Sequence, residues 1–397
     1  MLMPVYFACH TLQLTRAVYG PLLFTAIQLR CVTHLYTLFS MQHYAGCKIW
    51  CVLFYFQLLY IAFIIHLSLN KQLPMLQKRP MNYIFILFTL PVLISCHREV
   101  TIAKDNTVSA SSQSGIVTQK NGPLGVVYVE VNSNNLLNSG CYTLLHGGQQ
   151  LFDIAIIFAA NINYDVAHKR AIEYNNENVS RVLQNRDQYI KPLQDKGIKV
   201  LLSILGNHQG AGISNFTSRA AARDFAKQLR DTVNYYNLDG IDFDDEYADY
   251  GNNNTPQPND SSFTILVAEL RSLMPKKIIS FYYYGPATSK LTYKGYQAGQ
   301  FINYSWNAIY GTYNPPVVPG LNKSQLAPAA IWINNTSAST AKSLAQRTKS
   351  DGYGAYLYYD LTKTNVTNYL SGISTALYND STFLESGCLQ SWPLFTK

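Results

Sequence analysis

Acidic residues are missing from the first 80 positions of this 397-residue chain, although that segment holds six of its 31 Lys and Arg residues. Subtracting these six from the formal net charge of +8 leaves +2 for the rest, which contains no run of basic residues. Because nucleic-acid binding depends on clustered Lys and Arg side chains, we expect no nucleic-acid partner. A neutral or weakly charged partner fits this composition.

Cysteine is scarce after residue 80, where only Cys96, Cys141 and Cys388 occur. Three cysteines do not make a disulfide framework, and separations of 45 residues or more give no metal-ligand pattern. The sequence therefore predicts no metal site. It leaves open whether Cys141 and Cys388 pair.

Two apolar stretches lie in the N-terminal part of the chain. The first, about residues 49–69, is long enough to span a bilayer. The second follows Lys78 and Arg79 and ends in Leu93-Ile94-Ser95-Cys96, which gives a basic region, a short apolar region and a small-residue cleavage site. Its ending resembles the lipobox of bacterial lipoproteins, in which the cysteine is lipidated.

We therefore expect residues 75–96 to be a lipoprotein signal peptide and Cys96 to carry a lipid. The mature protein is then a bacterial cell-envelope protein, lipid-anchored facing the periplasm or the cell surface, or else secreted. Residues 1–74 are either an upstream extension from a wrongly chosen start codon or a membrane segment. Residues 97–122, rich in Ser, Asn and Gln toward their end, indicate a flexible tether.

From residue 123 onward, apolar β-branched runs alternate with amphipathic helical patterns, which indicates βαβ units and a parallel sheet. The expected strands are Gly125–Val131, Ile154–Ala160, Val200–Leu205, Gly240–Asp244, Ile278–Tyr283, Phe301–Tyr310, Ala329–Ile333 and Gly354–Tyr359. The expected helices are Glu177–Lys196, Ser218–Tyr236, Ser261–Met274, Ser339–Ser350 and Asn365–Tyr378, the second and third starting on serine caps.

Eight such strands in about 260 residues predict an α/β fold of the (β/α)8 TIM-barrel type. We place this single catalytic domain at residues 123–385, followed by a C-terminal tail at residues 386–397. An open doubly wound sheet more often carries a Gly-rich loop after its first strand, where this chain has Asn132-Ser133-Asn134-Asn135.

The fourth predicted strand and the residues after it carry a run of carboxylates. Side chains alternate along a strand, so Asp242, Asp244 and Glu246 point one way and Ile241 and Phe243 the other. The apolar pair suits the surrounding helices, which leaves the acidic face for the barrel interior. Glu246, the last of the three, then lies nearest the C-terminal mouth, where barrel active sites form.

Three carboxylates stacked in a barrel interior are costly to ionise together, so their pKa values separate and one group stays protonated near neutral pH. The three carboxylates come from one strand and the residues after it, whereas the two catalytic carboxylates of most glycosidases lie on opposite sides of the cleaved bond. This arrangement favours substrate-assisted cleavage, in which the 2-acetamido group of a sugar attacks its own anomeric carbon. A calcium-binding loop is the alternative, but the apolar strand pattern disfavours it.

Asp239–Glu246 resembles the DGxDxDxE signature of glycoside hydrolase family 18. Further stretches resemble the endo-β-N-acetylglucosaminidases of the H and F1 type: Tyr128–Asn132, Ile157–Tyr164, Leu205–Gly212, Asp245–Asn253, Ser305–Asn307 and Tyr310–Thr312. The resemblance implies hydrolysis, with retention and without a cofactor, of the β-1,4 bond in the N,N′-diacetylchitobiose core of high-mannose or hybrid N-linked glycans. We expect a monomer acting on glycoproteins.

Roles carry over by position. Glu246 matches the acid/base, Asp244 the carboxylate that orients the acetamido group, and Asp242 the buried partner that shares a proton with Asp244. Tyr310 is assigned as the tyrosine that holds the acetamido group, with Ile309 as the competing position. The residues Trp332 and Asn334, and the stretch 313–316, depart from the H-type pattern, so the resemblance implies no glycan-branch preference.

Asn207, Tyr284, Trp306 and Asn307 are the expected substrate-binding residues. Asn207 could hydrogen-bond a sugar hydroxyl, and the Trp306 ring could stack on a sugar or fill the core. One of the three tyrosines 282–284 is expected to face the pocket, although alternation does not say which. His208 is interpreted as a structural loop residue.

Two other functions remain open. A chitinase of the same family shares the acidic strand but not the stretches around Asn207 and Tyr247. A barrel that binds N-acetylglucosamine glycans without cleaving them is typical of relatives that lack the terminal glutamate, and this chain retains Glu246.

Overall fold

The computed structural model describes residues 120–392 of the chain. The apolar stretch at 49–69, the expected signal peptide and Cys96 lie outside the described residues, as does the end of the predicted tail at 393–397. Among residues 120–392, no helix is both long and apolar enough to cross a bilayer.

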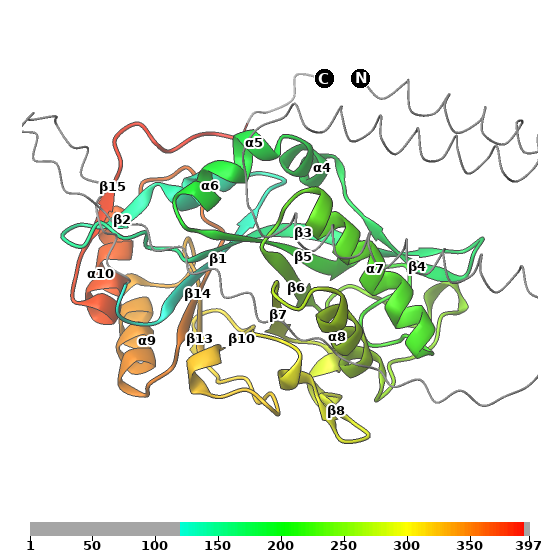
Figure 1. The fold of residues 1–397 in the computed structure, drawn as a ribbon. Helices are drawn as coiled ribbons and strands as arrows, with labels where there is room; N and C mark the ends of the chain where they lie inside the picture. The colour runs from blue at the N-terminus through cyan, green and yellow to red at the C-terminus, as the bar shows by residue number, and fades with distance from the viewer. Residues whose placement is uncertain (1–119, 393–397) are drawn as a thin grey trace, which may run out of the picture. The chain divides into compact units, whose positions relative to one another are not determined.

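The predicted barrel is confirmed by a ring of parallel strands (Figure 1). Its members are β1 (Leu124–Glu130), β3 (Ile154–Asp165), β5 (Lys199–Gly206), β6 (Gly240–Asp244), β7 (Ile278–Tyr283), β10 (Tyr304–Asn307), β12 (Leu326–Ala327) with β13 (Ala329–Trp332), and β14 (Ala355–Tyr359). Pro328 separates β12 from β13, since proline has no N–H to give a ladder. β12 pairs with β10 and β13 with β14, which pairs with β1, so this interrupted strand closes the ring.

Predicted and observed strand ends agree best for β6 and β7. The sixth strand is shorter than predicted, because the 3₁₀ turn η4 (Ala298–Gln300) precedes it and the chain turns after Asn307. β3 is longer, and continues beyond the barrel to pair with the antiparallel β4 (Arg170–Tyr174). Its register with β5 shifts between Ile157 and Ala160.

Four of the predicted helices are present, namely α7 (Arg219–Tyr235), α8 (Ser262–Leu273), α9 (Ala338–Ser350) and α10 (Thr367–Tyr378). Ser218 caps α7 through Ala221 N, whereas the Ser261 side chain caps no N–H of α8. The single helix predicted at 177–196 is wrong. It is three short helices, α4 (Glu177–Gln184), α5 (Arg186–Tyr189) and α6 (Lys191–Asp195). Pro192 lies in the first turn of α6, where its missing N–H is tolerated.

The links without an α-helix hold 3₁₀ turns and short strands. Between β1 and β3 lie η1 (Leu136–Gly140) and β2 (Tyr142–Leu144). The links on either side of β10 hold η3 (Pro286–Ser289), β8 (Thr292–Tyr293), β9 (Tyr296–Gln297), β11 (Thr312–Tyr313) and η5 (Lys323–Gln325). The weak helical signal of these links in the sequence thus corresponds to real irregular structure.

Two apolar layers are separated by the sheet. The larger lies between the strands and the helices and includes Ile241 and Phe243, whose ring meets Phe263 of α8 edge-on at 5.9 Å. The smaller fills the barrel interior and includes Val126, Tyr128 and Trp306. The predicted orientation of β6 is therefore confirmed, with the apolar residues facing the helices.

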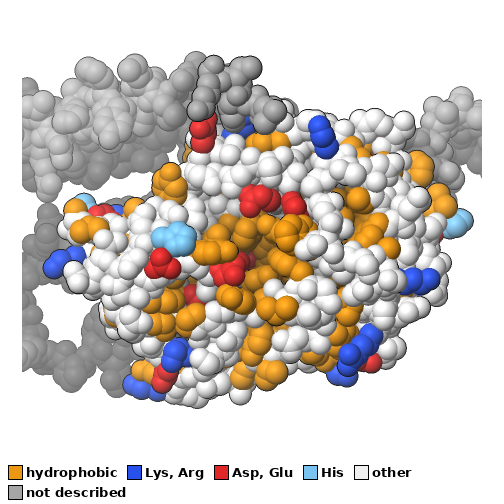
Figure 2. Space-filling model, turned by 180° about the vertical axis from the view of Figure 1, so that it is seen from behind, with side chains coloured by type: hydrophobic (Ala, Val, Ile, Leu, Met, Phe, Trp, Pro, Cys, Tyr) orange, Lys and Arg blue, Asp and Glu red, His pale blue; other side chains and the backbone are white. Residues whose placement is uncertain are grey.

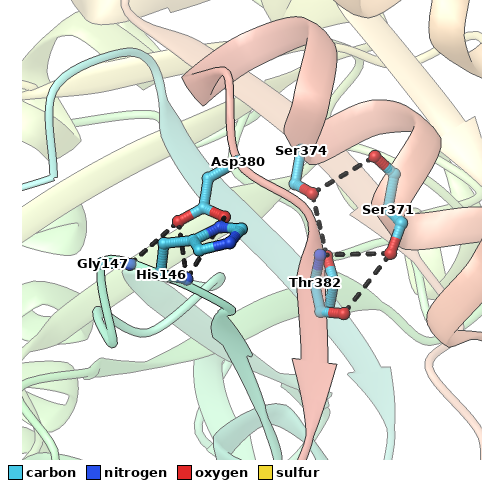
Figure 3. A network of polar contacts seen from close by, with 6 residues as sticks. All are labelled: His146, Gly147, Ser371, Ser374, Asp380 and Thr382. Carbon is cyan, nitrogen blue, oxygen red and sulfur yellow. Dashed lines mark hydrogen bonds and ion pairs between the residues drawn. The ribbon is translucent and has the colours of Figure 1, made fainter.

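The segment after α10 is fastened to the barrel. β15 (Thr382–Leu384) pairs with β2, and Cys388 forms a disulfide with Cys141, 247 residues away. In Figure 3 the Asp380 carboxylate accepts hydrogen bonds from the turn at His146 and Gly147, and Thr382 bonds to serines of α10. The described part of the predicted tail, residues 386–392, thus packs on the barrel, and Trp392 is buried.

Candidate active site

The acidic face of β6 points into the barrel. Asp242 is fully buried, Asp244 is 3% exposed, and Glu246 follows the strand at its C-terminal edge, where it is partly buried. Asp245 points the other way and accepts hydrogen bonds from Ser214 Oγ at 2.6 Å and Ala287 N at 2.8 Å. The alternation that selected three of the four carboxylates is therefore observed.

Asp242 is surrounded by donors from four other strands. Its Oδ2 accepts from Tyr128 OH at 2.7 Å and Ser203 Oγ at 3.0 Å, and its Oδ1 from Ser280 Oγ at 2.5 Å and Trp306 Nε1 at 3.2 Å. Burial raises the pKa of Asp242, and these four hydrogen bonds act in the opposite direction. Protein donors thus take the place of water around the Asp242 carboxylate.

Asp244 has no such support. Its Oδ1 is buried and has no hydrogen-bond partner among residues 120–392. Burial raises the pKa of Asp244 well above its ordinary value, and the neighbouring carboxylates of Glu246, Asp242 and Asp245 raise it further. The Oδ1 of Asp244 therefore has no hydrogen bond among residues 120–392 to oppose the rise in pKa, whereas the four hydrogen bonds to Asp242 oppose it there.

The calcium-loop alternative does not fit this geometry. Asp242 and Asp244 lie within the barrel, and within the part of the chain that the structure describes no group of three or more His, Cys, Asp or Glu side chains is placed to hold a metal ion.

Glu246 is held by the loop that follows β5. Gly206 N donates to Glu246 O at 3.0 Å, and His208 N donates to Tyr247 O at 2.6 Å. A Cβ on Gly206 would lie 2.3 Å from Glu246 O, so only glycine permits this approach. Burial raises the pKa of Glu246. A carboxyl group with a raised pKa at the mouth suits a general acid.

Tyr310 lies among aromatic side chains beside Asp244. Its ring stacks on Tyr359 at 5.0 Å and lies 6.4 Å from Tyr282 and 6.5 Å from Trp332. Burial raises the pKa of Tyr310 most. Tyr282, which shares a hydrogen bond with Tyr310, raises it further, and Asp244 adds a smaller rise, so the hydroxyl stays a hydrogen-bond donor. The competing residue, Ile309, is 47% exposed and has no polar atom in its side chain.

Two of the expected substrate-binding residues are in the wrong environment for that role. Trp306 is fully buried, so no sugar can stack on it, and its indole instead supports Asp242. Asn307 is also buried and donates to Thr312 O at 3.1 Å while accepting from Ile309 N at 3.0 Å. The amide thus shapes the loop that presents Tyr310.

Asn207 and Tyr284 lie at the mouth. Asn207 Nδ2 donates to Asn163 Oδ1 at 2.8 Å, and the register shift in β3 directs Asn163 toward that side chain. Tyr284 is 39% exposed, whereas Tyr282 is buried in the barrel and donates from its hydroxyl to Ala308 O at 2.7 Å. His208 is exposed and pairs with Asp249.

Three residues of the site were not identified from the sequence, namely Tyr128, Ser203 and Ser280. Ser203 and Ser280 are the direct neighbours of Asp242 on β5 and β7. A small hydroxyl residue within each apolar strand was the available signal. To place these hydroxyls beside Asp242 one must know the register of the strands, which a single sequence does not supply.

The rim of the mouth is acidic and aromatic. Glu130 is the last residue of β1 and Asp360 follows β14, and neither forms an ion pair among residues 120–392. Figure 2 shows one face of the molecule on which acidic side chains gather around a hollow lined with apolar ones, with Lys and Arg toward the edges. A neutral, ring-shaped ligand suits such a surface.

Known proteins resemble this chain in sequence and in structure. The family model of the glycosyl hydrolases family 18 matches residues 126–363. The endo-beta-N-acetylglucosaminidase of Flavobacterium sp. (strain SK1022) is 53% identical over 262 residues, 66% of this chain and 82% of that protein. Endo-beta-N-acetylglucosaminidase F1 of Elizabethkingia meningoseptica is 36% identical over 309 residues, 75% of this chain and 89% of that protein.

A solved structure of EndoBT-3987 from Bacteroides thetaiotamicron, in complex with Man9GlcNAc2Asn substrate, has a TM-score of 0.61 and 28% identity, and the match covers 70% of each chain. The matched family region spans the barrel and its three inward and mouth-facing carboxylates. The chain therefore belongs to the glycosyl hydrolases family 18.

Proposed function

We propose that the protein is an endo-β-N-acetylglucosaminidase that hydrolyses the β-1,4 bond of the N,N′-diacetylchitobiose core of high-mannose or hybrid N-linked glycans. The observation that carries the proposal is the stack of Asp242, Asp244 and Glu246, in which an unpartnered buried carboxyl group lies behind a general acid at the mouth. The relatives' names and the Man9GlcNAc2Asn complex of EndoBT-3987 support the choice of substrate.

The reaction begins at the N-acetylglucosamine whose anomeric carbon forms the bond to be cleaved. The oxygen of its acetamido group attacks that anomeric carbon. The glycosidic C–O bond breaks as Glu246 gives its proton to the leaving oxygen. Glu246, now ionised, takes a proton from water, which attacks the same carbon from the vacated side and breaks its bond to the acetamido oxygen, so the acetamido group is restored. Two inversions give net retention, and Glu246 regains its proton.

Asp244 orients the acetamido group. Its free Oδ1 accepts the acetamido N–H, and Tyr310 OH donates to the acetamido oxygen. As positive charge develops on the acetamido group, the Asp244 proton passes to Asp242, so that an anion faces the intermediate. Three of the four donors to Asp242 are hydroxyls, which rotate freely enough to permit this transfer.

Glu246→Gln leaves a side chain of the same shape that donates no proton. We expect release of glycan from a high-mannose glycoprotein to fall by about 10²–10⁴-fold, measured as the loss of glycan mass with one N-acetylglucosamine left on the protein. Asp249→Asn, on the same loop but exposed and paired with His208, is the control and keeps its activity. Cleavage of chitin oligomers with no change in glycoprotein mass would indicate a chitinase.

Asp244→Asn should stabilise the fold and lower kcat. The raised folded-state pKa of Asp244 means that the native chain binds more protons than the unfolded chain above pH ~3.9, so stability falls as pH rises. The asparagine variant lacks this loss. Its melting temperature should exceed that of the unmodified protein at pH 7.5 but not at pH 3.5, and equal differences at both pH values would contradict this assignment.

Tyr310→Phe removes the hydroxyl that we assign to the acetamido group and keeps the stacked ring. We expect kcat to fall at least tenfold with the melting temperature nearly unchanged, since one catalytic hydrogen bond is worth about 1.4 kcal/mol or more. Tyr313→Phe, which loses a bond to Asp351 on the same stretch of chain, serves as the control. Equal kcat values for the two variants would exclude Tyr310 from the reaction.

We further propose that the protein acts as a monomer held at the bacterial cell envelope by a lipid on Cys96. The basic, apolar and small-residue segments before Cys96 support this localisation. When the full chain is expressed in bacteria fed labelled palmitate, Cys96→Ala should abolish the label and move the enzyme from the membrane fraction to the soluble fraction. If the chain that retains Cys96 takes up no label, the proposed lipid anchor is contradicted.

A further inference from the structure

The side chain of the proposed general acid has no partner that fixes it. Among residues 120–392, the Glu246 carboxyl group forms no hydrogen bond and no ion pair. The regular pairing of β6 ends at Asp244, two residues before it. A general acid must nevertheless lie within hydrogen-bond reach of the atom that it protonates. The position of Glu246 therefore depends on what holds its backbone.

That backbone lies between two glycines on the strands that flank β6. Gly206, the last residue of β5, packs against Glu246 O. Gly285, which follows β7, has a φ of +71°, and a Cβ there would lie 2.1 Å from Asp245 O. Only glycine combines this conformation with so close an approach. The loops after β5 and β7 thus pass directly against the peptide units of Asp245 and Glu246.

The Asp245 side chain ties the same loops together. Its Oδ2 accepts hydrogen bonds from Ser214 Oγ at 2.6 Å and Ala287 N at 2.8 Å, and its Oδ1 accepts one from Tyr250 OH. These three donors lie in the loops after β5, β7 and β6, respectively, and β6 pairs with both other strands. One carboxylate therefore connects three successive loops at the mouth of the barrel.

This connection forms a closed ring that is shielded from water. Ser214 N donates to Tyr250 OH at 3.1 Å, so Asp245, Ser214 and Tyr250 are each bonded to the other two. A Cβ on Gly212 would lie 2.3 Å from Tyr250 OH, so the loop after β5 packs closely on that hydroxyl. Because Asp245 is only 4% exposed, water cannot readily replace a hydrogen bond lost there, and a buried donor is left unsatisfied.

We propose that Asp245 is a positioning residue, which holds the backbone of Glu246 so that its carboxyl group reaches the glycosidic oxygen. The Asp245 side chain points away from the barrel interior, so it acts through Glu246 and not on the substrate. The inference rests on the proposed function and deepens it. Three loops joined at one carboxylate, and not the strand alone, then determine where the general acid lies.

Asp245→Asn keeps the shape of the side chain but replaces one acceptor oxygen with an NH₂ group, so at least one of the three donors loses its partner. We expect kcat on Man9GlcNAc2Asn to fall about 10–100-fold and KM to stay nearly unchanged, because a displacement of about 1 Å can cost about 10²-fold in rate. In the full chain that also carries Glu246→Gln, the same change should lower the residual rate no further, because the group that Asp245 positions is already absent.

Glu173→Gln is the matched control for loss of stability. Glu173 is a partly buried carboxylate of β4 whose Oε2 accepts a hydrogen bond from Thr232 Oγ1 of α7 at 2.6 Å, away from the three loops that Asp245 joins. This variant should lower the melting temperature and leave kcat unchanged. A fall in kcat that follows the melting temperature in both variants would show that Asp245 is merely structural.

Two results would overturn the role of Asp245. One is an unchanged kcat in Asp245→Asn, and the other is an equal fold decrease with and without Glu246→Gln. If Asp245→Asn does not fold, Tyr250→Phe removes one donor and keeps the ring, and its smaller decrease in kcat should likewise vanish in the Glu246→Gln chain. Failure of the unmodified protein to release any glycan would instead overturn the proposed function.

Discussion

The unequal solvation of two buried carboxyl groups is the constraint on which this site depends. Among residues 120–392, Asp242 receives four hydrogen bonds inside the barrel, and Asp244, two residues later, receives none at its Oδ1. Both lie where water cannot compensate an ion, so the pair must divide one proton and one charge unevenly. The four donors favour a charge on Asp242, and the mechanism that we propose accordingly places the proton on Asp244.

The strands of the barrel surround Asp242 and Asp244, and the four donors to Asp242 come from β1, β5, β7 and β10. Closure of the ring brings strands that are distant in sequence to one carboxylate. The loops after β5 and β6 then place Glu246 at the mouth, where it is only partly buried. The loop after β10 places Tyr310 against Tyr359 and Tyr282. Rigid strands hold the two buried carboxyl groups, and loops carry Glu246 and Tyr310, which we propose contact the substrate.

Much of this arrangement was predictable from the sequence. The apolar runs located the strands, and period-two alternation separated Asp242, Asp244 and Glu246 from Asp245. The burial of Trp306 and Asn307 was not predictable, because a short strand next to irregular links gives too few residues to show which side chains are covered. The register that puts Ser203 and Ser280 beside Asp242, and the pairing of Cys141 with a cysteine 247 residues away, depend on tertiary contacts that no local pattern contains.

The most direct measurement of the central claim is the infrared difference spectrum between the unmodified protein and Asp244→Asn at neutral pH. The account predicts the carbonyl band of a protonated carboxyl group, present in the unmodified protein and lost in the variant. A difference spectrum containing only bands of an ionised carboxylate would show that Asp244 carries no proton, and would contradict the division of charge between Asp242 and Asp244.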